Sequence, residues 1–226
     1  EIKDNKNIEC HLGFEGDIKH IQKMQPLIKE ADIILNHEYE ILGKIYTINS
    51  INWHQDYNSG YIWPKEKSLD LDKDNTDKKI PWELSRFQHF LTLSLAYKQT
   101  KEDKYYLEFE TQILDWIKEN PLGLGINWST PMECSIRAIN LIQAFHIFEE
   151  RIPTNLKEII ITLIYNHGHY IRNNLEWSPA KENHYIADLT GLFFIGIFFN
   201  KEKWISFSKK ELETVVERLG IESNML

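Results

Sequence analysis

Hydrophobic residues recur every three or four positions along most of the chain, which is the period of an α-helix with one buried face. Asn120-Pro121 ends one of these segments, and Pro81 and Pro153 suit the start of others. About seven helices are therefore predicted, with little strand pattern. They are expected over about 17–37, 82–97, 103–119, 131–150, from Pro153 through Ile164 and beyond, 183–199 and 204–218.

These helices are expected to form antiparallel hairpins, because short and long connections alternate between them. There is no heptad pattern and no exact repeat. A bundle, an α-solenoid and an (α/α) toroid all fit this periodicity. Residues 38–80 are polar and broken by Asn, Gly, Pro and Asp, so we expect a long loop of the functional or mobile kind.

Composition, net charge and cysteine spacing limit the kinds of protein that this chain can be. A chain of 226 residues with 42% hydrophobic residues can build a sizeable core, and its net charge of −8 argues against nucleic-acid binding. No apolar run approaches the ~20 residues of a membrane span. Cys10 and Cys134 fit no metal spacing and are expected to be free thiols. The chain begins at Glu1 without a signal peptide, so its localisation stays open.

The aromatic residues are unusual in their placement. Four of the seven tryptophans stand beside turn residues rather than inside apolar stripes. Such rings either stack on sugars or pack into the core, and the sequence leaves both uses open. The four are Trp53, Trp63, Trp82 and Trp128.

Two predicted helix beginnings carry charged residues at helical spacing. Glu83 and Arg86 are three residues apart, and Glu133 and Arg137 are four apart, so each pair shares a helix face. Asn140 continues the second stripe. Such pairs usually lie on a solvated face, but here they follow loops, and their guanidinium groups suit carboxylate or sulfate ligands.

A third helix beginning combines Asn183 and His184 with Asp188 four residues after the histidine. Asn183 would serve as an N-cap in a purely structural interpretation. The positive end of the helix dipole would equally suit an acidic sugar. His167 and His169 do not share a face, so no metal site is expected, and no cofactor motif is found.

At these same positions the sequence resembles the heparinase II/III family. The resemblance covers about residues 30 to 215, in order and with sensible spacing. The matching segments are Trp53-His54-Gln55-Asp56, Gly60-Tyr61-Ile62-Trp63-Pro64, Lys79 through Arg86, Asn120-Pro121 through Trp128, Met132-Glu133, Arg137 through Asn140, Asn173 with Leu175 through Ser178, and Glu182 through Leu189.

The resemblance implies an all-α, incomplete (α/α) toroid and β-elimination at the uronic acids of an acidic polysaccharide. Asn183 and His184 match the family's residues that face the uronate carboxylate, and His184 could instead take the proton. We therefore expect these two to be catalytic. The other helix-start residues are expected to bind substrate: Trp82, Glu83, Arg86, Trp128, Glu133, Arg137 and Asn140.

The family's catalytic Tyr and a further His belong to segments that residues 1–226 do not match. We therefore expect one truncated helical domain, a missing C-terminal β-sandwich of the same protein as its partner, and little lyase activity from these residues alone. An unsulfated acidic glycan is favoured, because the segments expected to line the cleft hold few basic residues.

Two other functions stay open. An inverting glycoside hydrolase would need two carboxylates roughly 6.5–9.5 Å apart, and Asp56, Glu83, Glu133 and Asp188 are the candidates. A non-catalytic glycan-binding or scaffold module in surface-polysaccharide metabolism would bind a glycan without turning it over.

Overall fold

A computed structural model describes residues 25–178 and 182–218. The elements in chain order are α1 (Gln25–Leu35), β1 (Glu38–Ile41), β2 (Lys44–Thr47), α2 (Lys79–Ser85), α3 (Gln88–Thr100), α4 (Asp103–Glu119), the 3-10 helix η2 (Ile126–Trp128), α5 (Pro131–Phe148), α6 (Thr154–Asn173), α7 (Glu182–Phe198) and α8 (Glu202–Arg218). The helical prediction is confirmed, although the first helix begins at Gln25, and the predicted part over 17–24 lies outside the described residues together with Cys10.

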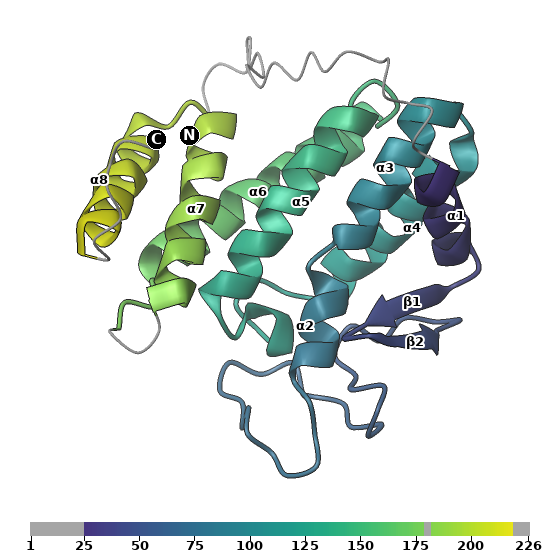
Figure 1. The fold of residues 1–226 in the computed structure, drawn as a ribbon, viewed down its shortest axis with the longest axis horizontal. Helices are drawn as coiled ribbons and strands as arrows, with labels where there is room; N and C mark the ends of the chain where they lie inside the picture. The colour runs from purple at the N-terminus through teal and green to yellow at the C-terminus, as the bar shows by residue number, and fades with distance from the viewer. Residues whose placement is uncertain (1–24, 179–181, 219–226) are drawn as a thin grey trace.

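The helices pack as successive antiparallel hairpins. Helices α3, α5 and α7 lie side by side, and α4, α6 and α8 each pack against the preceding member of that row (Figure 1). Gly191 allows a close approach of α7 to α5, because a Cβ there would lie 2.4 Å from the Cβ of Ser135. This double row of alternating helices is the arrangement expected for part of an (α/α) toroid, one of the three arrangements that the periodicity left open.

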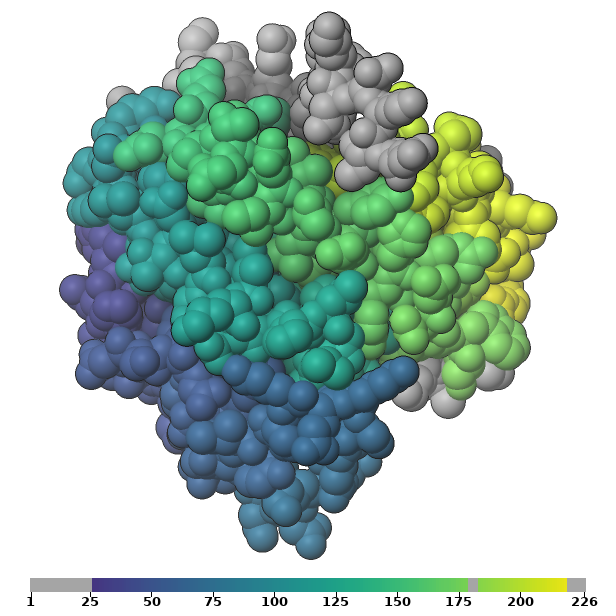
Figure 2. All heavy atoms as spheres, turned by 180° about the vertical axis from the view of Figure 1, so that it is seen from behind, coloured from purple at the N-terminus to yellow at the C-terminus, as the bar shows by residue number. Residues whose placement is uncertain are grey.

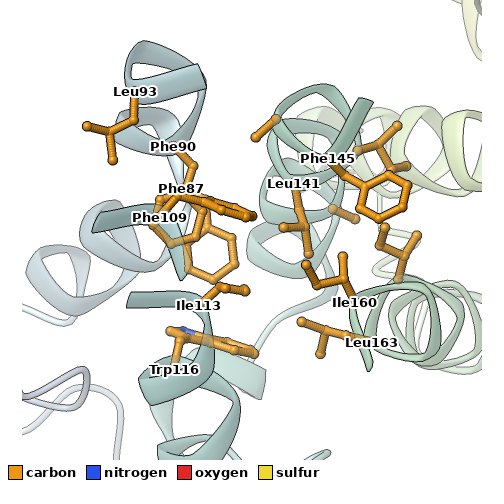
Figure 3. Packing of buried hydrophobic residues seen from close by; sticks show 14 of the residues in the cluster. Phe87, Phe90, Leu93, Phe109, Ile113, Trp116, Leu141, Phe145, Ile160 and Leu163 are labelled. Atoms are coloured by element: carbon orange, nitrogen blue, oxygen red, sulfur yellow. The ribbon is translucent and has the colours of Figure 1, made fainter. Parts of the chain in front are cut away.

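The core fills the space between the two rows. Figure 3 shows aromatic rings from α3 and α4 meeting aliphatic side chains of α5 and α6. Phe87 stacks on Phe90 with 4.4 Å between ring centroids, and Trp116 meets Phe87 edge to face at 5.3 Å. These rings are fully buried and hold the helix row rigidly.

The prediction of one helix over 82–97 is wrong. The helix ends at Ser85 and a new one begins at Gln88, because Phe87 adopts a left-handed conformation with φ 62°. Such a conformation costs a non-glycine residue roughly 1–2 kcal/mol. Burial of the Phe87 ring among other aromatic rings offsets that cost, and the break leaves Arg86 at a corner between α2 and α3.

The segment over 38–80 is more ordered than a plain loop. Its first part forms a β-hairpin in which Glu38 pairs with Thr47, a strand signal that the sequence prediction missed. The turn residues Leu42 and Gly43 both have positive φ, as tight hairpin turns require. Residues 48–78 then project below the helices in both whole-molecule views (Figures 1 and 2).

Hydrogen bonds to α4 and η2 fix this projecting segment. The Trp53 indole donates to Asp115 at 2.9 Å, and His54 Nε2 lies 3.0 Å from the Glu119 carbonyl. Asn127 donates to the Trp53 carbonyl at 2.8 Å. The segment is therefore part of the rigid frame. None of the described helices is both long and apolar enough to cross a membrane.

Candidate functional site

The three predicted site regions lie at one end of the molecule. Helix α2 and the N-terminal ends of α5 and α7 lie at the end from which residues 48–78 project (Figure 1), and η2 packs against α2 and α5. The N-terminal ends of α5 and α7 therefore lie at the same end of the molecule although they are far apart in the chain.

Arg86 forms a bidentate ion pair that joins α2 to α5. Its Nε and second terminal nitrogen donate to the two carboxylate oxygens of Glu133 at 2.7 and 2.9 Å. Its first terminal nitrogen binds Glu83, as the three-residue spacing predicted. Asn140 donates to the Arg86 carbonyl at 2.8 Å. Two carboxylates thus already balance the charge of Arg86 within the protein. Its expected role in binding a glycan stays a prediction.

Glu133 and Arg137 share a helix face, but no ion pair joins them in the described part of the chain. Arg137 is fully buried and donates to the Asn127 carbonyl at 2.7 Å and to Nε2 of His167 at 2.9 Å. Its guanidinium lies 4.6 Å from the ring centre of Trp116 and also faces Trp128. Arg137 is therefore a core residue that ties η2 to α5 and α6, and it presents no charge at the surface.

His167 serves the same core rather than a metal. Because Arg137 can only donate, Nε2 of His167 accepts, and Nδ1 carries the proton toward the Leu163 carbonyl 2.8 Å away. Burial and the adjacent guanidinium lower the pKa of His167 well below its ordinary value. Within the described ranges, no three His, Cys, Asp or Glu side chains are arranged to hold a metal ion.

The tryptophans expected to stack on sugar are buried. Trp82 donates its indole N–H to the Ile126 carbonyl at 2.9 Å, and Trp128 donates to the Asn120 carbonyl at 3.3 Å. Trp53 and Trp63 are 1% exposed, so the core alternative holds for all four. Trp177, by contrast, has 61% of its surface open to solvent, and it stands just before α7.

The first turn of α7 carries the predicted catalytic pair. Asn183 is exposed and His184 is half-buried. Nδ1 of His184 lies 3.2 Å from a carboxylate oxygen of Glu176, in the segment before α7. Glu176 and Trp177 lie within a segment that resembles the family, but no role is predicted for either from the sequence.

Asp188 anchors the segment that carries Glu176 and Trp177. It is fully buried, and its Oδ2 accepts the Glu176 backbone N–H at 2.8 Å. Its Oδ1 has no hydrogen-bond partner in the described part of the chain. Burial, together with the nearby Glu176 carboxylate, raises the pKa of Asp188 to about 7. A native carboxyl group with such a pKa is typical of functional sites, although structural networks also produce it.

A hollow of about 630 Å³ lies beside the C-terminal end of α6. Its walls come from the projecting segment, from the turn before η2 and from the last turns of α6. The hydroxyl of Tyr170 donates to the Trp128 carbonyl at this wall. A sugar-sized ligand fits this volume. The lining residues are Lys67, Ser68, Leu69, Leu71, Leu122, Gly123, Leu124, Gly125, Trp128, Ser129, Tyr170 and Asn174.

Three of the four carboxylates considered for a hydrolase are already engaged. Asp56 accepts the backbone N–H groups of Asn58 and Asp77 and stabilises a turn. Glu83 and Glu133 share Arg86. Asp188, the fourth candidate, is fully buried, so its carboxyl group is not exposed at the surface where a glycan would bind.

Comparison with protein families decides the relationship. The family model for the heparinase II/III N-terminus matches residues 4–218. The chain belongs to the heparinase II/III family. Two curated relatives, both named heparin-sulfate lyase, come from Bacteroides stercoris (25% identical over 196 residues) and Pedobacter heparinus (29% over 185 residues). These matches cover 77% and 76% of this chain but 27% and 25% of the relatives, so the chain spans about a quarter of their length.

Solved structures of the family share the fold. The heparan sulfate lyase HepC from Pedobacter heparinus matches with a TM-score of 0.67 and 23% identity, over 86% of this chain and 29% of that one. A heparinase III structure matches with a TM-score of 0.61 and 16% identity, over 86% and 30%. The expectation of an all-α fold, the helical part of an (α/α) toroid, is thereby confirmed.

Proposed function

We propose that this chain is the helical domain of a polysaccharide lyase that cleaves a uronic-acid-containing polysaccharide by β-elimination. The observation that carries the proposal is the placement of Asn183 and His184 in the first turn of α7, with His184 beside Glu176. Family membership and the names of the two curated relatives support the same class of reaction and an acidic polysaccharide as substrate.

Each step of β-elimination requires a different kind of protein group. In β-elimination the uronate carboxylate must be neutralised so that H5 becomes acidic, a base removes H5, and an acid protonates the departing O4. An exposed Asn183 amide can donate to the carboxylate, and the positive end of the α7 helix dipole adds positive potential there. His184 is within the same turn and can exchange a proton.

We infer that most of the other predicted binding residues support the site by joining the elements around it. The Arg86 and Arg137 interactions hold α2, η2 and α5 together, and their partners Glu83, Glu133 and Asn140 complete those contacts. Direct stacking on a sugar ring passes to the exposed Trp177. Since neither arginine is free to bind sulfate, a substrate recognised through its uronate carboxylate is favoured. Trp82 and Trp128 contribute as buried supports of these elements.

The test is the formation of unsaturated product by the full-length protein on a panel of sulfated and unsulfated uronate polymers. We expect ultraviolet absorbance to rise for the wild type and to be lost in Asn183→Ala and His184→Ala. Asn155→Ala is the matched control, because Asn155 is an exposed asparagine in the first turn of α6. It should retain full activity.

Two results would overturn the proposal. Glycan binding without turnover would indicate a non-catalytic binding or scaffold module. Release of reducing ends without unsaturated product would indicate a hydrolase. Isothermal titration and a reducing-end assay on the same polymer panel distinguish these outcomes.

A further inference from the structure

The ring of His184 is held by a carboxylate from outside its own helix. Its Nδ1 lies 3.2 Å from a carboxylate oxygen of Glu176, eight residues earlier in the chain. The side chains of His184 and Glu176 are 26% and 14% exposed, so the contact is largely shielded from water. Shielding strengthens such a contact and makes it a defined orientation rather than a passing surface pair.

The chemistry of the two groups fixes the direction of this hydrogen bond. A carboxylate can only accept, so the proton of a neutral His184 ring must be on Nδ1. Nε2 then carries the lone pair. A ring in this state accepts a proton at Nε2 and cannot donate one from that atom to a substrate carboxylate.

Glu176 is itself fixed by the helix that bears His184. Its backbone N–H donates to Oδ2 of Asp188 at 2.8 Å, and Asp188 is fully buried in α7. His184 and Asp188 are four residues apart, so they share one face of α7. The segment carrying Glu176 is thereby held against the same face, and its carboxylate is presented to the ring.

We propose that Glu176 is a positioning residue that holds His184 as the Nδ1–H tautomer, with Asp188 anchoring Glu176. The proposal deepens the proposed function and rests on it for its catalytic meaning. It divides the roles of the neighbouring pair: Asn183 donates to the uronate carboxylate, and His184 receives the C5 proton at Nε2. As the C5–H bond breaks, its electron pair forms the C4–C5 double bond, and O4 leaves with a proton from an acid.

The tautomer can be measured without any activity. Two-bond proton–nitrogen correlation spectra of the ¹⁵N-labelled protein distinguish the two neutral forms of a histidine ring. We expect His184 to show Nδ1–H in the wild type and to lose that preference in Glu176→Ala. Glu176→Gln keeps a carbonyl acceptor and should retain it. His169, an exposed histidine on α6, is the internal control and should not change in either variant.

Kinetics supply the second readout. In the full-length protein, Glu176→Ala should lower kcat at least tenfold with little change in KM, and Glu176→Gln should recover part of that loss. Thermal unfolding of each variant separates misfolding from mispositioning. A kcat fall that follows a loss of folded protein would indicate a structural role and overturn the proposal.

The outcomes separate this proposal from the proposed function. An Nε2–H tautomer in the wild type, or an unchanged tautomer and kcat in Glu176→Ala, would overturn the positioning role while the lyase activity stands. A wild-type protein that cleaves no uronate polymer would overturn the proposed function. In that case an Nδ1–H tautomer dependent on Glu176 would still support the ring-holding contact.

Discussion

Replacing Asp188 by asparagine should change how the stability of this protein depends on pH. The side chain is fully buried, and burial raises its native pKa to about 7, whereas an unfolded chain gives it about 3.8. Between these values the unfolded state ionises first, and the native state keeps its proton. Native stability contributed by the protonated group is therefore complete below pH 4 and is lost as pH rises toward 7.

The size of this effect follows from the two pKa values. A difference of one pKa unit corresponds to about 1.4 kcal/mol, so about three units give a loss on the order of 4 kcal/mol by pH 8. The groups that face Asp188 are Glu176 and Cys134. The Cys134 thiol has a pKa raised by burial to about 12 and does not titrate in this window.

The Asp188→Asn variant would keep an oxygen that accepts the Glu176 N–H while losing the ionisable group. Urea unfolding followed by circular dichroism from pH 4 to pH 8 measures the difference between wild type and Asp188→Asn. The gap should widen in favour of the variant as pH rises. Asp103→Asn is the control: Arg151 lowers the pKa of Asp103, so that carboxylate is ionised in both states above about pH 5 and should add no pH dependence there. Parallel pH curves for wild type and Asp188→Asn would refute the reasoning.

Three further substitutions test the Arg86–Glu133 ion pair, the close contact between α5 and α7, and the exposed Trp177 ring. Glu133→Gln should lower the free energy of unfolding by about 3 kcal/mol because it breaks a buried bidentate pair. Asp103→Asn at the exposed pair with Arg151 should cost much less, and equal losses in urea unfolding would contradict this. Gly191→Ala should destabilise by roughly 1–3 kcal/mol because its Cβ would meet Ser135, and an unchanged melting temperature would rule out that close contact. Trp177→Ala should leave the melting temperature unchanged and weaken glycan affinity in isothermal titration; unaltered affinity would remove the ring from the binding surface.

Local sequence pattern determined most of the helices. The fourth helix was predicted over the same residues that form it, Asp103–Glu119, and α7 begins one residue before the predicted start at Asn183. Helical period and end signals act within a few residues of each other, so they are visible in the chain without knowledge of the fold. The Glu83–Arg86 pair was predictable for the same reason.

Tertiary structure decided where those side chains point and what they meet. Glu133 pairs with Arg86, 47 residues away, rather than with Arg137 on its own helix, and no local spacing encodes that partner. Phe87 breaks a helix that its neighbours favour, because its ring is buried among aromatic residues from other segments. Whether a tryptophan packs inside or stays exposed, as at Trp128 and Trp177, depends on which helix covers it. Packing between segments that are distant in the chain decides these partners and this burial, so they can be seen only in the folded molecule.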